Sequence, residues 1–351
     1  MLPCCSSEPP ARSALHSPPM RASVVVPCFN SLRWLPATVD SLLSQTFDDY
    51  EVVLVDDGGD DDLAGWVKQR GDDRLRVVRQ ENAGVSAARN RGVRESSGAL
   101  VAFCDSDDLW TPDALERLIE TYDADPQVGL VYGWYDVIDA LGQPTGRIHT
   151  SEIEGEVWER LLVTNPVATS IALVPRAVFE AVGGFEVNRE SFPIDVEDWA
   201  LWIRIAEHHQ VAVVREVLCH HRRHDTNSSS DVASLDAAYR HLLTSMFERR
   251  RGEPGYPADR LQELQGVALG RIEMILAWHS LNDDGNAEAA RAYRRSARRH
   301  SPGLRRRPEY WRLGAAVAVL SVLGRSGYAA VRSTSSRIRR VVPIGASGTN
   351  A

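Results

Sequence analysis

The segment GALVAFCDSDDLW, residues 98–110, runs an apolar stretch directly into a cluster of aspartates. Residues 99–103 have the composition of a buried strand, and Asp105, Asp107 and Asp108 follow it closely. Carboxylates this close together repel one another, so leaving them unpaired beside a buried strand is destabilising. Two explanations are open at this point: a hard cation such as Mg²⁺ or Mn²⁺ binds the oxygens, or nearby arginines pair with them.

The same arrangement, an apolar run followed by polar residues, occurs twice before this segment. ASVVVPCFN (22–30) and YEVVLVDDGGD (50–60) are β-branched runs, and WLPATVDSLLSQ (34–45) between them has apolar residues at helical spacing. Short apolar strands that alternate with helices indicate an α/β fold whose parallel sheet is covered on both faces. Because ligands of such sheets bind beyond the carboxyl ends of the strands, we expect both acidic clusters at one edge.

The pattern changes after Trp110. VGLVYGWYDVID (128–139) alternates as a strand, and DVEDWALWIRIAEHHQ (195–210) is a strong amphipathic helix with an acidic start. VAVVREVLCHHRRH (211–224) is interpreted as a strand pair that leads into a polar loop. From about residue 232 the pattern is helical throughout.

Charge is distributed unevenly along the chain. The formal net charge is −8, yet residues 291–340 contain fourteen arginines and a single acid, Glu309. A nucleic-acid partner is not indicated, because the basic segment contains no recognisable nucleic-acid-binding module. The uncharged run 313–324 is shorter than the roughly 20 residues that span a bilayer. A peripheral contact of this basic tail with an anionic membrane and simple packing on the preceding α/β domain both stay open.

The N-terminal residues and the cysteines bear on the location of the protein. Residues 1–20 are rich in Pro and Ser and lack the apolar core of a signal peptide, so a flexible tail is expected there. Cys28 and Cys104 end apolar runs, where a free buried thiol is the usual state. These features favour a cytoplasmic protein, either free or peripheral at the inner face of the membrane.

Six segments together resemble the nucleotide-sugar-dependent glycosyltransferases of family 2. They are VVVPCFN (24–30), SLLSQTFDDYEVVLVDDGGDD (41–61), NAGVSAARNRG (82–92), FCDSDDLW (103–110), VGGF (182–185) and EDWALWIRIAE (197–207). The resemblance implies a GT-A type, Rossmann-like mixed sheet flanked by helices over residues 21–230, followed by a helical, arginine-rich extension over 231–351.

The resemblance also implies roles for individual residues. Asp198 matches the position of the catalytic base, with Glu197 beside it. Asp105 and Asp107 match the metal-binding D-x-D motif, and His224 is a third candidate ligand for Mg²⁺ or Mn²⁺. The residues that match nucleotide-sugar contacts are Pro27, Phe29, Asn30, Asp57, Asn82, Arg89, Asp105 and Ser106. From the residues alone, Glu197 and Asp198 have a simpler explanation, since acids suit the first turn of a helix.

The implied activity is an inverting, metal-dependent transfer of a sugar from a nucleotide-diphosphate donor, most commonly a UDP-sugar, to a glycan or lipid-linked acceptor. The chain lacks the Q-x-x-R-W motif of polymerising members, so non-processive synthesis of a cell-surface glycan is expected. Two alternatives remain: a nucleotidyltransferase, and a relative that binds nucleotide sugars without catalysis.

Overall fold

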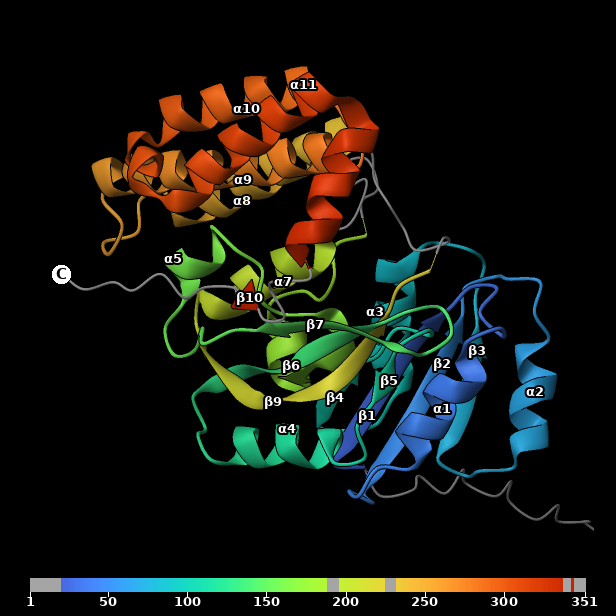
Figure 1. The fold of residues 1–351 in the computed structure, drawn as a ribbon. Helices are drawn as coiled ribbons and strands as arrows, with labels where there is room; N and C mark the ends of the chain where they lie inside the picture. Colours follow the sequence, from blue (N-terminus) through green and yellow to red (C-terminus); the bar gives the residue numbers. More distant parts are fainter. Residues whose placement is uncertain (1–19, 188–195, 225–231, 337–341, 344–351) are drawn as a thin grey trace, which may run out of the picture.

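The computed structural model describes residues 20–187, 196–224, 232–336 and 342–343. A single mixed sheet forms its centre, with the strand order β10-β7-β6-β8-β4-β1-β2-β3, and β9 pairs with both β5 and β6 (Figure 1). The first-half elements are β1 Ala22–Cys28, α1 Leu35–Leu43, β2 Tyr50–Asp56, α2 Leu63–Arg70, β3 Leu75–Arg79, α3 Val85–Glu95, β4 Leu100–Phe103, β5 Leu109–Trp110 and α4 Ala114–Asp123. They are followed by β6 Val128–Ile138, β7 Pro144–Thr150, α5 Trp158–Leu161, η1 Thr169–Ile171, β8 Ala172–Pro175, α6 Arg176–Ala181, α7 Glu197–Ala206 and β9 Gln210–Arg222.

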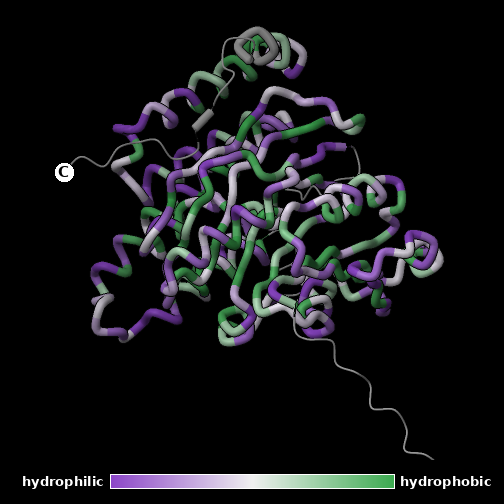
Figure 2. The backbone as a smooth tube through the Cα atoms, turned by 90° about the horizontal axis from the view of Figure 1, so that it is seen from below, coloured by the Kyte–Doolittle hydropathy of each residue, from purple (hydrophilic) through white to green (hydrophobic). Residues whose placement is uncertain are grey.

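The parallel half of the sheet consists of β3, β2, β1 and β4, as the alternation of strands and helices predicts. All seven residues of β2 are buried, which is typical of strands that are covered on both faces. Cys28 pairs with Asp56 and Val25 pairs with Phe103, so these parallel strands end at the same edge of the sheet. Figure 2 shows the apolar strand segments as green stretches within the interior. The predicted α/β fold with a mixed sheet is confirmed.

The other half of the sheet differs from the sequence prediction in one respect. Residues 211–224 were interpreted as a strand pair, but β9 is a single strand that runs parallel to β6 over nearly its whole length. The pairing shifts register between Gly133 and Trp134 and again between Trp134 and Tyr135, and such bulges bend a long strand without ending it. The neighbouring β7 is polar and exposed at its start, so its sequence lacks a strand pattern.

Four helices follow the sheet: α8 Val232–Arg250, α9 Ala258–Asn282, α10 Ala287–His300 and α11 Pro308–Ser336, with the 3₁₀ turn η2 Pro302–Arg306 before the last and β10 Val342–Pro343 after it. Residues of α8 and α9 share a hydrophobic core with α7, and Trp199 meets Tyr239 edge-to-face at 5.6 Å. The predicted helical extension is therefore packed on the α/β part of the chain through α7. The boundary between residues 230 and 231 stays a prediction, and the predicted tail 1–20 lies outside the described residues except Met20.

The apolar part of the last helix is longer than the sequence analysis predicted. One helix among the described residues, Pro308–Val331, is by length and composition apolar enough to cross a membrane, with 24 residues, a mean hydropathy of 1.4 and 17% of its window buried. The sequence prediction counted only the run 313–324 and so missed the apolar residues on either side. Gly324 nevertheless interrupts the helix, with φ 66° and ψ −177°. The helical stretch before it, residues 308–323, is about 24 Å long at 1.5 Å per residue, shorter than the ~30 Å hydrocarbon layer.

Gly92 determines how closely α3 packs on the sheet. A Cβ atom at this position would lie 2.3 Å from Val25 Cγ1 and 3.0 Å from Val55 Cγ2, so no larger residue fits without a shift. We expect Gly92→Ala to lower the free energy of unfolding by about 1–3 kcal/mol through overpacking. Urea unfolding checks this against Gly303→Ala, where nothing lies within 4 Å of the added atom. An equal effect of both substitutions would contradict the packing argument.

Candidate active site

The three aspartates that follow β4 have three different partners. Asp108 is fully buried; its carboxylate accepts a hydrogen bond from the backbone N–H of Arg222 (2.8 Å) and lies 3.1 Å from Nδ1 of His221. These contacts attach the end of β9 to the acidic segment. Asp108, whose role could not be assigned from the sequence, therefore has a structural role.

Asp105 is paired with an arginine. Arg89 is buried on α3, and its guanidinium donates to Asp105 Oδ1 at 2.7 Å and to Glu197 Oε1 at 3.1 Å. Burial raises the pKa of Asp105, but the charge and hydrogen bond of Arg89 outweigh burial, so the pKa lies below its ordinary value. Arg89 thereby brings together the end of β4 and the start of α7, two parts of the predicted site that are far apart in sequence.

The negative charge of Asp107 is compensated less than that of Asp105. Its Oδ2 lies 2.8 Å from Nε2 of His224, whose ring stacks on Trp34 with a centroid distance of 5.1 Å. Burial and the charges of Asp108 and Asp105 raise the pKa of Asp107 to about 6. A carboxylate destabilised in its charged form by neighbouring carboxylates is a suitable ligand for a cation.

Asp107 and His224, which lie 2.8 Å apart, offer oxygen and imidazole donors that suit a divalent metal, and Asp105 lies two residues before Asp107 at the same edge of the sheet. The described residues contain no compact group of three or more acidic, histidine or cysteine ligands. The protein donors would therefore need oxygens from a substrate or water to complete a coordination shell, as is common for Mg²⁺.

Asp198 is the second carboxylate with a strongly altered pKa. It accepts a hydrogen bond from Thr169 Oγ1 at 3.0 Å, and it lies in the first turn of α7. A helix N-terminus favours the charged form by about 0.3–1 kcal/mol, less than one pKa unit. Burial and the adjacent Glu197 dominate instead and raise the pKa of Asp198 to about 7. The helix-terminus explanation therefore does not account for this residue.

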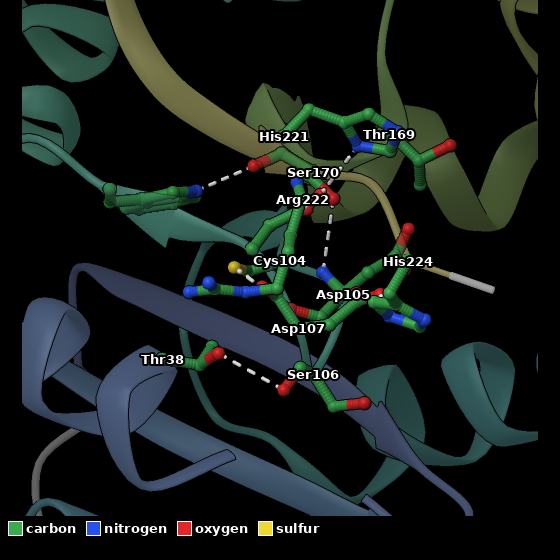
Figure 3. A network of polar contacts seen from close by, with 12 residues as sticks. Thr38, Cys104, Asp105, Ser106, Asp107, Thr169, Ser170, His221, Arg222 and His224 are labelled. Carbon is green, nitrogen blue, oxygen red and sulfur yellow. Dashed lines mark hydrogen bonds and ion pairs between the residues drawn. The ribbon is translucent and has the colours of Figure 1, made fainter. Parts of the chain in front are cut away.

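The short element η1 connects Asp198 to the acidic segment after β4. No sequence pattern predicted this connection. Thr169 binds Asp198, and the next residue, Ser170, accepts a hydrogen bond from the backbone N–H of Asp105 at 3.1 Å. Figure 3 shows both side chains beside the acidic segment. Ser106 is held separately, since its carbonyl accepts a hydrogen bond from Thr38 on α1 at 3.0 Å.

The residues predicted to contact the nucleotide lie around the ends of β1 and β2. Asp57 accepts hydrogen bonds from the backbone N–H groups of Ala83 (2.9 Å) and Gly84 (2.8 Å), so it braces the loop that contains Asn82 before α3. The neighbouring Asp56 accepts a hydrogen bond from the backbone N–H of Gly59 at 3.2 Å and forms an ion pair with Arg79 at 2.5 Å, so it braces the loop that follows β2. The predicted contact of Asp57 with the nucleotide stays a prediction.

Pro27, Phe29 and Asn30 follow the same edge at the end of β1. Phe29 is 53% exposed, and Asn30 has a positive φ of 50°. The Asn30 side-chain oxygen accepts a hydrogen bond from the backbone N–H of Asp60 at 2.7 Å, which joins the β1 and β2 ends. More than half of the Phe29 surface is exposed, so the ring is available to a ligand.

An aromatic pair that the sequence did not reveal lies on the opposite side of the acidic edge. Tyr135 on β6 stacks on His149 of β7, with ring centroids 4.5 Å apart, and meets His221 edge-to-face at 5.9 Å. No described residue hydrogen-bonds the Tyr135 hydroxyl, and the buried Nδ1 of His149 likewise has no partner among them. Burial raises the pKa of Tyr135 to about 12, and Asp198 contributes to that increase.

Comparison with known proteins identifies the fold and the family. The family model for glycosyl transferase family 2 matches residues 23–182, the part of the chain that carries Arg89 and all three aspartates. The chain contains a family 2 glycosyltransferase domain. The resemblance inferred from the six sequence segments is thereby confirmed.

The individual relatives have low sequence identity to this chain. The chain spans 26% and 35% of the length of two uncharacterised Rickettsia glycosyltransferases, to which it is 29% and 27% identical. Escherichia coli WfgD, named a UDP-Glc:alpha-D-GlcNAc-diphosphoundecaprenol beta-1,3-glucosyltransferase, is 26% identical over 55% of this chain and 72% of its own.

Two solved structures share the fold of this family 2 chain. Staphylococcus aureus TarS 1–349 in complex with UDP-GlcNAc superposes with a TM-score of 0.61 at 16% identity, covering 91% of this chain and 93% of TarS. The mannosyltransferase PcManGT of Pyrobaculum calidifontis, in complex with GDP-Man and Mn²⁺, gives a TM-score of 0.50 at 20% identity over 88% of this chain and 89% of its own.

The raised pKa of Asp198 predicts a pH-dependent stability difference. An acid whose folded pKa of about 7 exceeds its unfolded value stabilises the fold below pH ~4, and that contribution is lost as the pH rises to about 7. Asp198→Asn should therefore unfold like the wild type near pH 4 and be more stable at pH 8, on the order of a few kcal/mol.

Urea unfolding at several pH values measures this difference. The control is Asp259→Asn, at an exposed acid on α9. A wild-type advantage at pH 8 would show that the Asp198 carboxylate is charged without cost in the folded protein.

Proposed function

We propose that the protein is an inverting, metal-dependent glycosyltransferase that uses a nucleotide-diphosphate sugar. The observation that supports this most strongly is the hydrogen-bonded connection from the acidic edge to Asp198. Arg89 bridges Asp105 to Glu197, and Thr169 and Ser170 connect Asp198 to the backbone of Asp105. A proton acceptor and a phosphate-binding edge are thus held in fixed relation, as a transfer reaction requires.

Asp198 is assigned as the general base. The acceptor hydroxyl gives its proton to the carboxylate while its oxygen forms a bond to the anomeric carbon, and the bond from that carbon to the diphosphate breaks with its electrons retained by the leaving nucleoside diphosphate. A base with a pKa of about 7 is well matched to this task near neutral pH. Thr169 donates to one carboxylate oxygen and so orients the group.

The donor is assigned to the edge formed by the ends of β1, β2 and β4. Asp105, Asp107 and His224 would hold Mg²⁺ or Mn²⁺, which stabilises negative charge on a departing diphosphate. A UDP-sugar is the preferred candidate, because WfgD is named for UDP-Glc and the TarS structure contains UDP-GlcNAc. Phe29 and Asp57 would then border the nucleobase of the donor. The rest of the nucleotide would be bordered by Pro27, Asn30, Asn82 and Ser106.

The acceptor is assigned to the side that carries Tyr135 and His149. A stacked ring pair with a free phenol hydroxyl offers an apolar face and one hydrogen bond, which suits a sugar ring. The named acceptor of WfgD is lipid-linked, so we favour a lipid-linked glycan in non-processive cell-surface synthesis. The free buried thiols of Cys28, Cys104 and Cys219 agree with a cytoplasmic location.

The activity is tested with a panel of nucleotide sugars, Mn²⁺ or Mg²⁺, and lipid-linked or oligosaccharide acceptors. We expect release of a nucleoside diphosphate, with kcat lowered about 10²–10⁴-fold in Asp198→Asn through loss of the base. Asp107→Ala should cost ~100-fold or more through weakened metal binding. Asp113→Asn, an acid at the start of α4, serves as the control.

The pH profile gives a second test of the same assignment. Because the base acts when deprotonated, kcat/KM should rise as the pH increases through about 7 in the wild type. The residual activity of Asp198→Asn should lack that rise. Pyrophosphate as the product would instead indicate nucleotidyl transfer, and full activity of both active-site variants would exclude the assigned roles.

Tyr135→Phe tests the acceptor side separately. Removing only the hydroxyl should raise KM for the acceptor about 5–10-fold, the value of one hydrogen bond, while KM for the donor stays unchanged. Tyr132→Phe is the matched control, because its hydroxyl bonds Ser151 and the Ile153 carbonyl inside the core. An increase in donor KM alone would place Tyr135 on the wrong side of the site.

A further inference from the structure

The helix α11 has apolar residues on two faces, and only one of these faces is covered by protein. Tyr310, Leu313, Val317 and Leu320 are buried in a core cluster with residues of α9 and α10. Trp311, Ala315, Ala318 and Val322 recur at helical spacing on the opposite face, and all four are exposed. Trp311 is 59% exposed, Val322 80% and Leu323 53%. We call Trp311, Ala315, Ala318, Val322 and Leu323 the outer face of α11.

A helix that is apolar on all sides normally lies inside a protein or a membrane. The outer face lies on the helical unit above the sheet, and only the last part of α11 turns back toward the sheet (Figure 1). Large exposed apolar patches of this kind mark interaction sites.

Arginines border the outer face at both ends. Arg305, Arg306 and Arg307 precede α11, and the Trp311 indole donates to the Arg305 carbonyl at 2.8 Å, which fixes this segment beside the face. Arg312 lies next to Trp311 in the helix, and Arg325 follows the interruption at Gly324. All five arginines are exposed, and none forms an ion pair with an acid in the described part of the chain.

We propose that the outer face of α11 lies on the surface of an anionic lipid bilayer, with the five arginines at the headgroups. Exposed Trp and aliphatic residues flanked by arginines match the chemistry of an interfacial helix. The helix lies in the interface rather than crossing it, because Gly324 ends the helical stretch at about 24 Å, and the buried inner face is already used by α9 and α10.

Charge favours this occupant over a second copy of the chain. Two copies that met through the outer face would place their unpaired arginines against each other, which costs free energy, whereas anionic lipids neutralise them. The inference concerns a surface remote from the assigned catalytic residues, and it stands or fails independently of the proposed reaction.

Vesicle flotation of the full-length protein tests the inference. We expect binding to phosphatidylcholine vesicles that contain about one-third phosphatidylglycerol, and at least tenfold weaker binding to phosphatidylcholine alone. Val322→Asp should reduce binding to the anionic vesicles by about tenfold or more, since it loses apolar contact and adds a repelled charge. Arg306→Gln with Arg307→Gln should reduce it by about fivefold per arginine and weaken its salt dependence.

The matched control is Leu141→Asp, at a residue that is 84% exposed in the turn between β6 and β7 and should bind like the wild type. Circular dichroism and urea unfolding verify that each variant is folded. Equal binding of the wild type and Val322→Asp would overturn the proposal. A second result would also overturn it: the wild type fails to bind vesicles and forms a dimer, detected by light scattering, that Val322→Asp dissociates. A second copy of the chain would then cover the outer face.

Discussion

The buried guanidinium of Arg89 is the constraint on which the site depends. A charge taken out of water must be matched by hydrogen-bonded acids, and here the acids come from two different elements, Asp105 after β4 and Glu197 at the start of α7. Loss of either acid would leave part of this charge uncompensated. The position of Arg89 in turn depends on Gly92, one turn along α3, which lets the helix approach β1 and β2. Close packing therefore sets the electrostatics of the site.

The neighbouring carboxylates repel one another, but their surroundings compensate this repulsion to different degrees. The pKa values of the aspartates therefore differ, and so does their chemistry. Asp105 faces a fixed arginine and keeps a low pKa, whereas Asp107 faces two carboxylates and has a pKa of about 6. Asp198 is protected from water and has a pKa of about 7. The site thus holds one acid with a lowered pKa together with two acids whose pKa values lie near neutral pH, although all three are aspartates. Their surroundings decide this, since helix position alone shifts a pKa by less than one unit.

The sequence predicted the parts of the structure that depend on local pattern. The strands up to β4 are short apolar runs, and parallel topology places their ends together, so the acidic edge could be located before the structure was known. The contacts of Asp108 depend on the pairing of β5 with β9, and the stacking of Tyr135 on His149 depends on the pairing of β6 with β7. No local sequence pattern marks either pairing. Thr169 was missed because its link to Asp198 joins segments 29 residues apart through one hydroxyl.

The helical extension contributes to the site as well as to the surface of the molecule. The first turn of α7 presents Glu197 and Asp198, while its remaining residues, including Trp199 and Trp202, are buried in the core that α8 and α9 complete. Trp199 directly follows the assigned base, and its ring meets Tyr239 of α8. The orientation of the base is therefore determined partly by helices that carry none of the assigned catalytic residues. The helix α9 contributes to both cores of the extension: Ile272 and Leu276 are buried in the core shared with α7, whereas Met274 and Ala277 are buried in the core that holds the inner face of α11.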